Sequence, residues 1–268
     1  MRRLTFGYLN LYGSSQIEVI EAAAAAGFRS VGLRLEGRRT GDSFPHHVLG
    51  NRQQLREIKK RLADLDVFPS NVTGRSFDPE TGADQLAAVV DAGAELGCSY
   101  ILVNGHDPDE HRTTENIARL AAHAADAGLK IAVEFVPFHC IRDLPQALRI
   151  VTGTGADNIG LVIDALHLNR SGGRPDDIAG IAPGLIVCGQ VCDAPAEAPK
   201  SLDACLAESR SGRLYPGDGG LPLNAFIANL PKDCEIEVEV PHAGYEGVPL
   251  QAHAARIAAS LGQLMRNH

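Results

Sequence analysis

Short apolar runs alternate with alanine-rich amphipathic stretches along nearly the whole chain, and this alternation constrains the fold more than any other feature. The runs are typical of buried strands, and several of the stretches between them end at a glycine suited to a helix C-terminus. Strands are expected to begin at eight residues: Leu4 (LTFGYLNL), Ser30 (SVGLRL), Asp66 (DVFPSNV), Ser99 (SYILVNG), Lys130 (KIAVEFV), Ile159 (IGLVID), Leu185 (LIVCGQV) and Glu235 (EIEVEV). Such alternation favours parallel strands joined by crossover helices.

The eight units occupy a chain of 268 residues without a dividing linker rich in proline, glycine or serine. We therefore predict an α/β fold in which residues 1–268 form a single (β/α)8 barrel, a TIM barrel, in preference to an open doubly wound sheet. The GTG triplet at 153–155 precedes a strand instead of following one, so it does not match a dinucleotide-binding loop. The weakest predicted helix is the sixth, around DDIAGIAP.

Charge and composition exclude several classes of function. The net charge of -8 argues against a nucleic-acid partner. The apolar stretches are too short to span a membrane, and the N-terminus does not match an export signal, so we expect a cytoplasmic protein without a membrane partner. The six cysteines are expected to be buried free thiols, with Cys188 and Cys192 as a less favoured pair of metal ligands. No lysine is expected near the barrel mouth, which excludes a Schiff-base aldolase.

The fifth to eighth predicted strands each end near a polar residue. These residues are Glu134, Asp164, Gln190 and Glu239. A barrel gathers the C-terminal ends of its strands at one mouth, so three carboxylates and an amide oxygen are expected to meet there. Burying the carboxylates is costly unless a cation compensates for them, and oxygen ligands favour Mn²⁺ or Mg²⁺ over Zn²⁺. We predict one divalent metal ion at these four residues, with Glu237 as a rival ligand on the same side of its strand as Glu239.

Motifs along the C-terminal half resemble a known family. The segments VEF, DALHLNRSGG, QVCDAP, GRLYPGDGGLPL and EVEVP follow one another in this order. They resemble the xylose isomerase-like barrels, which include sugar-phosphate isomerases and epimerases. The resemblance implies that Glu134, Asp164, Gln190 and Glu239 hold the metal ion. The epimerases usually have histidine at the third position, whereas Gln190 followed by the DAP tripeptide looks more like the bacterial 3-dehydroshikimate dehydratases of this superfamily.

A divalent ion at a barrel mouth can polarise a carbonyl and its neighbouring hydroxyl, so that a base can remove a proton from the adjacent carbon. We expect an isomerase or epimerase that acts through an enediolate on a small ketose, keto-polyol or sugar phosphate. A dehydratase of the 3-dehydroshikimate type is the first alternative, and a non-catalytic sugar-binding barrel is the second. Glu134 and Glu239 are the predicted acid/base pair, as in the epimerases of the family. His167, on the loop after the sixth strand, is expected to act on a substrate oxygen.

Basic side chains on the predicted mouth loops indicate a small polyhydroxylated or anionic substrate. The predicted substrate-binding residues are Arg170, Arg213, Arg34, Arg75 and His106. His106 and Asp107 form an alternative metal or proton-transfer pair. The sequence leaves the oligomeric state open, and a homo-oligomer is compatible with it.

Overall fold

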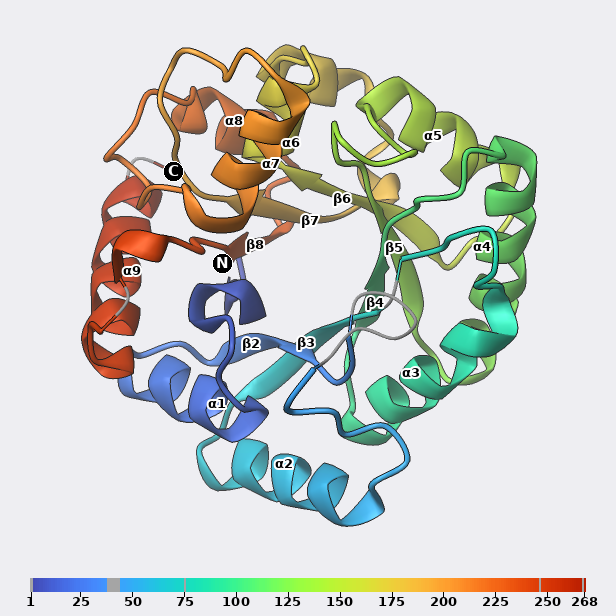
Figure 1. Cartoon of the computed structure of the whole chain (residues 1–268), viewed down its shortest axis with the longest axis horizontal. Helices are drawn as coiled ribbons and strands as arrows, with labels where there is room; N and C mark the ends of the chain where they lie inside the picture. Colours follow the sequence, from blue (N-terminus) through green and yellow to red (C-terminus); the bar gives the residue numbers. More distant parts are fainter. Residues whose placement is uncertain (1, 38–43, 75, 246, 267) are drawn as a thin grey trace.

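Eight parallel strands form a closed barrel in which each strand pairs with the next and the last pairs with the first (Figure 1). This computed structural model describes residues 2–37, 44–74, 76–245, 247–266 and 268. The strands are β1 (Leu4–Phe6), β2 (Ser30–Arg34), β3 (Phe68–Thr73), β4 (Tyr100–Val103), β5 (Lys130–Glu134), β6 (Ile159–Asp164), β7 (Ile186–Val191) and β8 (Glu235–Val238). The predicted (β/α)8 barrel is therefore confirmed, and the open sheet is excluded.

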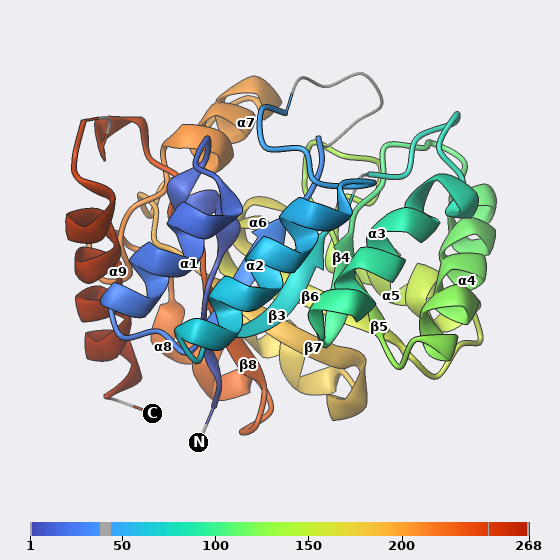
Figure 2. The same ribbon diagram turned by 90° about the horizontal axis from the view of Figure 1, so that it is seen from below.

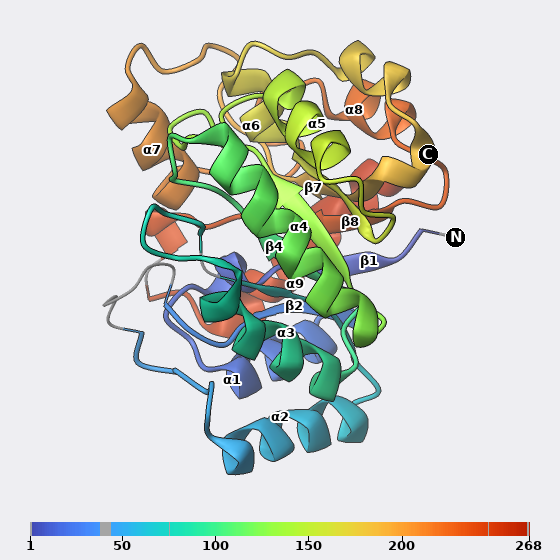
Figure 3. The same cartoon turned by 90° about the vertical axis from the view of Figure 1, so that its right-hand side faces the viewer.

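Helices form a ring around the barrel (Figures 1 and 2). They are α1 (Gln16–Ala25), α2 (Arg52–Asp64), α3 (Ala83–Leu96), α4 (Glu110–Asp126), α5 (Leu144–Gly153), α6 (Ala165–Arg170), α7 (Leu202–Ser211), α8 (Leu223–Asn229) and α9 (Leu250–Met265). Both chain ends lie at the end of the barrel opposite α7 (Figures 2 and 3). None of the described helices is long and apolar enough to cross a membrane. All six cysteines are free and only Cys140 is partly exposed, as expected.

The first strand is shorter than predicted because the chain turns away after Gly7. Residues Tyr8–Leu11 form a 3-10 turn instead of continuing the strand. The side chain of Asn10 then replaces a strand partner, since its amide donates to the carbonyl oxygen of Val238 (2.8 Å) and its Oδ1 atom accepts from the backbone N–H of Val240 (2.6 Å). The apolar pattern of LTFGYLNL thus combines a strand with a buried turn.

The segment after β6 also differs from the prediction. The helix α6 begins directly after the strand, because the Asp164 carboxylate accepts hydrogen bonds from the backbone N–H groups of Leu166 (2.7 Å) and His167 (3.1 Å). An aspartate in this position is a strong helix N-cap. His167 therefore lies on a helix and not on a loop, and the DDIAGIAP segment contains only a 3-10 turn at Pro175–Gly180.

Candidate active site and metal centre

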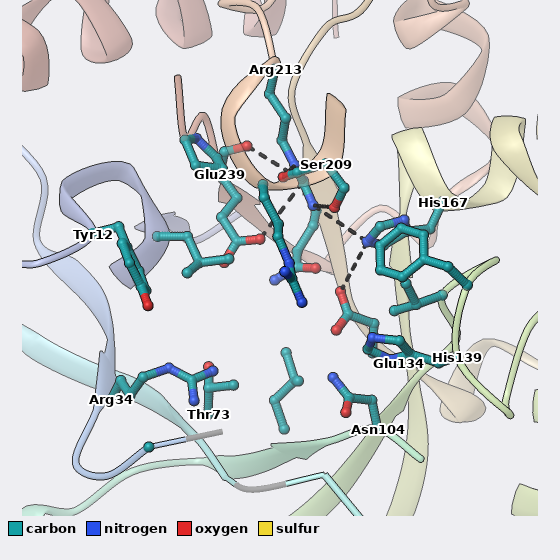
Figure 4. Close-up of a pocket in the computed structure, with 18 of the residues that line it drawn as sticks. Tyr12, Arg34, Thr73, Asn104, Glu134, His139, His167, Ser209, Arg213 and Glu239 are labelled. Atoms are coloured by element: carbon teal, nitrogen blue, oxygen red, sulfur yellow. Dashed lines mark hydrogen bonds and ion pairs between the residues drawn. The ribbon is translucent and has the colours of Figure 1, made fainter. Parts of the chain in front are cut away.

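A cavity of about 400 Å³ opens at the C-terminal mouth of the barrel, a size that suits a small molecule (Figure 4). Its polar lining comes from strand ends and from the segments that follow them. The lining includes Arg34, Thr73, Asn104, Glu134, His139, His167, Gln190, Ser209, Arg210, Arg213 and Glu239. Side chains from distant parts of the sequence thus converge here because parallel strands of a barrel end at the same edge.

Glu134, Asp164 and His167 form a buried group that could hold a metal ion. Each offers one ligand atom, and the three atoms lie within 4.8 Å of one another. Glu134 ends β5 and Asp164 ends β6, as the sequence predicted for two of the metal ligands. His167 joins them because the first turn of α6 places it beside the strand ends, where we expected it to face only the substrate.

Arg213 is a fully buried cation among the acidic residues. Its Nη1 atom lies 2.6 Å from the Asp164 Oδ2 atom and 3.7 Å from a carboxylate oxygen of Glu239. Burial alone would raise the pKa of Asp164, but the charges of Arg213 and His167 outweigh it and hold this pKa below its ordinary value. Arg213 therefore supplies part of the positive charge that the predicted metal ion was expected to provide.

Arg213 also contacts His167. Its Nη2 atom lies 3.3 Å from the His167 Nε2 atom, and the same ring nitrogen lies 4.0 Å from a Glu134 oxygen (Figure 4). A guanidinium group only donates, so Nε2 accepts in this contact when the imidazole is neutral and carries its proton on Nδ1. A protonated His167 would instead pair with the Glu134 carboxylate through this nitrogen.

The carboxyl group of Glu134 is less well compensated than that of Asp164. Burial and the neighbouring charges of Glu239 and Asp164 raise the pKa of Glu134 to about 8, although the charge of Arg213 and a hydrogen bond from Asn104 oppose this shift. Asn104 is oriented by Ser76, whose hydroxyl donates to the Asn104 Oδ1 atom. A carboxyl group in this environment stays protonated at neutral pH until further positive charge enters the cluster.

Glu239 and Glu237 lie at different levels of the barrel. Glu239 lines the cavity, whereas Glu237 is buried below it and accepts a hydrogen bond from the Gln190 Nε2 atom (2.8 Å). Gly7, directly after β1, leaves room for both carboxyl side chains, since a Cβ atom there would lie 3.1 Å from the Glu237 Oε1 atom and from the Glu239 Cγ atom. Of the two rivals, Glu239 is therefore the one that faces the cavity, but it is not part of the close group formed by Glu134, Asp164 and His167.

The donor set fits a divalent cation. The Gln190 Oε1 atom is buried and has no hydrogen-bond partner among the described residues, although nearly all buried polar atoms in proteins have one. Gln190 sits opposite Asp164 in the register between β6 and β7. An unpaired amide oxygen beside several carboxylates is a suitable ligand for a hard cation, and the nitrogen of His167 also admits Zn²⁺.

The structure separates the predicted substrate-binding residues. Arg34 and Arg213 line the cavity, whereas Arg170 is paired with Glu208 on α7 (2.8 Å) and lies outside the lining. The His106 ring stacks on that of His139, which does line the cavity, at 3.8 Å between the ring centroids. Arg75 lies outside the described residues.

The alternative pair of His106 and Asp107 is not supported by the geometry. Both Asp107 oxygens accept hydrogen bonds from Arg112, each at 2.6 Å. This arginine holds the pKa of Asp107 below its ordinary value. Asp107 thus contributes to the start of α4 and not to a metal site.

Sequence reasoning missed Asn104, His139 and Ser209 as residues of the cavity. Asn104 directly follows β4, so its position at a strand end was a usable signal of the same kind that identified Glu134. No comparable signal marked Ser209, which is buried on α7 and whose backbone carbonyl oxygen accepts a hydrogen bond from the Arg213 Nε atom (3.0 Å).

A comparison with protein families agrees with this architecture. A family model described as xylose isomerase-like TIM barrel matches residues 20–264. The chain belongs to this family. Among solved structures, this xylose isomerase-like barrel is similar to an IolI protein with a bound zinc atom, with a TM-score of 0.82 over 98% of this chain and 97% of the other, at 18% identity.

Two kinds of curated relatives share parts of the xylose isomerase-like barrel. A 3-dehydroshikimate dehydratase of Pseudomonas aeruginosa is 26% identical over 253 residues, which cover 88% of this chain and 38% of the relative. An inosose isomerase of Bacillus velezensis is 28% identical over 120 residues, which cover 44% of this chain and 41% of the relative. The chain thus spans less than half the length of the dehydratase that it matches.

Proposed function

We propose that this xylose isomerase-like barrel is a metal-dependent dehydratase that acts on a small anionic hydroxy-ketone of the 3-dehydroshikimate type. The observation that carries the proposal is the arrangement of Arg213, His167 and Glu134 at one point of the cavity wall, where a guanidinium, an imidazole and a carboxyl group meet. Elimination of water needs these functions: a base for the proton next to the carbonyl, and an acid for the leaving hydroxyl.

The charge of the cavity favours an anionic substrate. Arg34, Arg210 and Arg213 line it together with two carboxylic residues, Glu134 and Glu239. A guanidinium group binds a carboxylate with two parallel hydrogen bonds, which a neutral sugar does not require. The similarity to the dehydratases extends over most of this chain and so agrees with a substrate that carries a carboxylate.

Glu134, Asp164, Gln190 and Glu239 would hold the divalent cation, and His167 would stay free of it as the base. When bound, the cation supplies positive charge that polarises a substrate carbonyl and its neighbouring oxygen. The chain's own residues would move the proton: neutral His167 accepts it from the carbon next to the carbonyl and then returns it to the departing hydroxyl, which leaves as water. The Arg213 Nη2 atom lies 3.3 Å from the His167 Nε2 atom and so helps to fix the position of the imidazole ring.

Isomerisation or epimerisation is the second candidate, favoured by the position of Glu239. Glu134 ends β5 and Glu239 follows β8, so two carboxyl groups enter the cavity from strands that are not neighbours. Such a pair could exchange protons with opposite faces of a substrate. The first step, removal of a proton next to a carbonyl, is common to both reactions.

NMR in D₂O distinguishes the two reactions. The protein loaded with Mg²⁺ is incubated with 3-dehydroshikimate and, separately, with ketoses and inososes. A product lighter by one water supports the dehydratase, whereas deuterium incorporated beside the carbonyl without loss of water supports the isomerase. Substrate binding without either reaction would identify a non-catalytic barrel and refute the proposal.

Matched histidine variants test the role of His167. Replacing His167 by glutamine is expected to lower the rate of either reaction by roughly 100- to 10,000-fold, the usual contribution of a general base. His106→Gln is the control, because His106 lies outside the cavity lining and contacts it only through His139. Equal rates for the two variants would exclude His167 as the base.

A further inference from the structure

We infer that Glu237 is a positioning residue that orients the Gln190 amide so that its oxygen, and not its nitrogen, faces the acidic cluster at the barrel mouth. Gln190 and Glu237 are register partners on the adjacent strands β7 and β8. The inference rests on the proposed metal site, and it concerns how this chain makes a glutamine serve as a ligand.

A glutamine ligand needs a residue that orients it, because the oxygen and the nitrogen of its amide group have opposite hydrogen-bonding character. The carbonyl oxygen can bind a cation, whereas the NH₂ group only donates and would repel one. Rotation by 180° exchanges the two ends with little change in shape. Gln190 is 1% exposed, so solvent does not decide between the two orientations.

Glu237 decides between them by accepting a hydrogen bond. The Gln190 Nε2 atom lies 2.8 Å from the Glu237 Oε1 atom, and the Gln190 Oε1 atom has no hydrogen-bond partner in the part of the chain that the structure describes. In the reversed orientation the amide oxygen would face a carboxyl oxygen, and the NH₂ group would point at the acidic residues. The first arrangement is the one that offers an oxygen to a cation.

The Glu237 carboxyl group is itself fixed from the opposite side of the barrel. Its Oε2 atom lies 2.6 Å from the amide of Asn71 on β3, and that amide also contacts the Tyr100 hydroxyl at 3.0 Å. Gly32 on β2 makes room for this contact, because a Cβ atom there would lie 2.9 Å from the Glu237 Oε2 atom. The carboxyl group is thus held between two strands and cannot turn freely.

Both Glu237 oxygens are acceptors in this arrangement. The Asn71 Nδ2 atom donates to Oε2 and the Gln190 Nε2 atom donates to Oε1, so the carboxyl group offers Gln190 an acceptor and no donor.

Metal affinity of the whole chain, without substrate, tests the role of Glu237. We expect Glu237→Met to weaken Mn²⁺ binding in calorimetry by about 10- to 100-fold, the range found when residues that orient a ligand are removed. Glu235→Met is the matched control. Glu235 is a buried carboxyl two residues earlier on β8, hydrogen-bonded to the hydroxyl groups of Thr5 and Ser70 instead of to a residue of the mouth.

A double variant shows whether Glu237 acts through Gln190. If it does, Glu237→Met combined with Gln190→Met binds Mn²⁺ no more weakly than Gln190→Met alone, because both substitutions then remove the same contact between the Gln190 oxygen and the cation. Losses that multiply in the double variant would overturn the inference, as would equal effects of Glu237→Met and Glu235→Met. Failure of the unsubstituted protein to bind Mn²⁺ would refute the proposed metal site as a whole.

A measurement on the unsubstituted protein keeps the inference testable if the variants do not fold. The side-chain NH₂ signal of Gln190 in the Mg²⁺-loaded protein should exchange slowly with D₂O, since it is buried and bonded to Glu237. Rapid exchange of this group would contradict the inference.

Discussion

Replacing Arg213 by methionine is expected to lower the free energy of unfolding by about 3–5 kcal/mol in the presence of a chelator. The substitution leaves the Asp164 carboxylate buried without the guanidinium that lies 2.6 Å away, and both side chains are at most 2% exposed. Removing one partner of a buried ion pair has a cost of this size because the other charge stays uncompensated. For a chain of 268 residues, about 4 kcal/mol corresponds to a fall in Tm of roughly 7 °C.

A divalent cation should restore part of this stability. Mn²⁺ would bring positive charge back to Asp164, so it should raise the Tm of Arg213→Met by more than that of the unsubstituted protein. Arg170→Met is the control: the Arg170 side chain is equally buried and paired with Glu208, but outside the cavity. This variant should also have a lower free energy of unfolding, but Mn²⁺ should raise its Tm by no more than it raises the Tm of the unsubstituted protein.

Thermal unfolding with a chelator and with Mn²⁺ is the assay for both variants. A loss below about 1 kcal/mol in Arg213→Met, the level of an exposed ion pair, would show that Asp164 does not depend on the guanidinium. An equal response of the two variants to Mn²⁺ would show that the cation does not bind at Asp164.

Three further predictions concern protons, loop structure and thiols. The pKa of Glu134 is raised from an ordinary value of 4.5 to about 8, so between these pH values the folded protein binds more protons than the unfolded chain. In the presence of a chelator, the free energy of unfolding should therefore fall as the pH rises through this range. Urea titrations should show a smaller fall for Glu134→Gln. Asp193→Ala removes the acceptor of three backbone N–H groups, so it should lower the free energy of unfolding by about 2–4 kcal/mol and speed the proteolysis of residues 214–221. Asp193→Asn should lower the free energy of unfolding by less. Cys140 should react first with a thiol reagent in the native state, and simultaneous reaction of all six thiols would contradict the burial of the other five.

The pattern of strands and helices was readable from the sequence because it depends on local periodicity. Each strand of the barrel is buried on both faces, and each helix presents one apolar face, so both leave a clear pattern in the residues. The exceptions are segments in which a side-chain hydrogen bond ends an element: Asn10 binds the backbone of Val240 after β1, and Asp164 caps α6 directly after β6.

The strand-end residues Glu134, Asp164, Gln190 and Glu239 were predicted from sequence for a similar reason. A polar residue at the end of an apolar strand is conspicuous, and the barrel brings all such ends to one mouth. The same reasoning could not distinguish Glu239 from Glu237, because alternation along a strand gives the direction of a side chain but not its height in the barrel.

The sequence by itself therefore determined the closed barrel and the acidic end of the mouth, since both follow from periodicity along single elements. Only the tertiary structure decided that Arg213 neutralises Asp164, that Arg170 pairs with Glu208, and that Glu237 holds Gln190. These are contacts between elements far apart in the chain. The partners in these contacts are determined by packing and by the need to compensate every buried charge. Neither can be inferred from the residues of a single helix or strand.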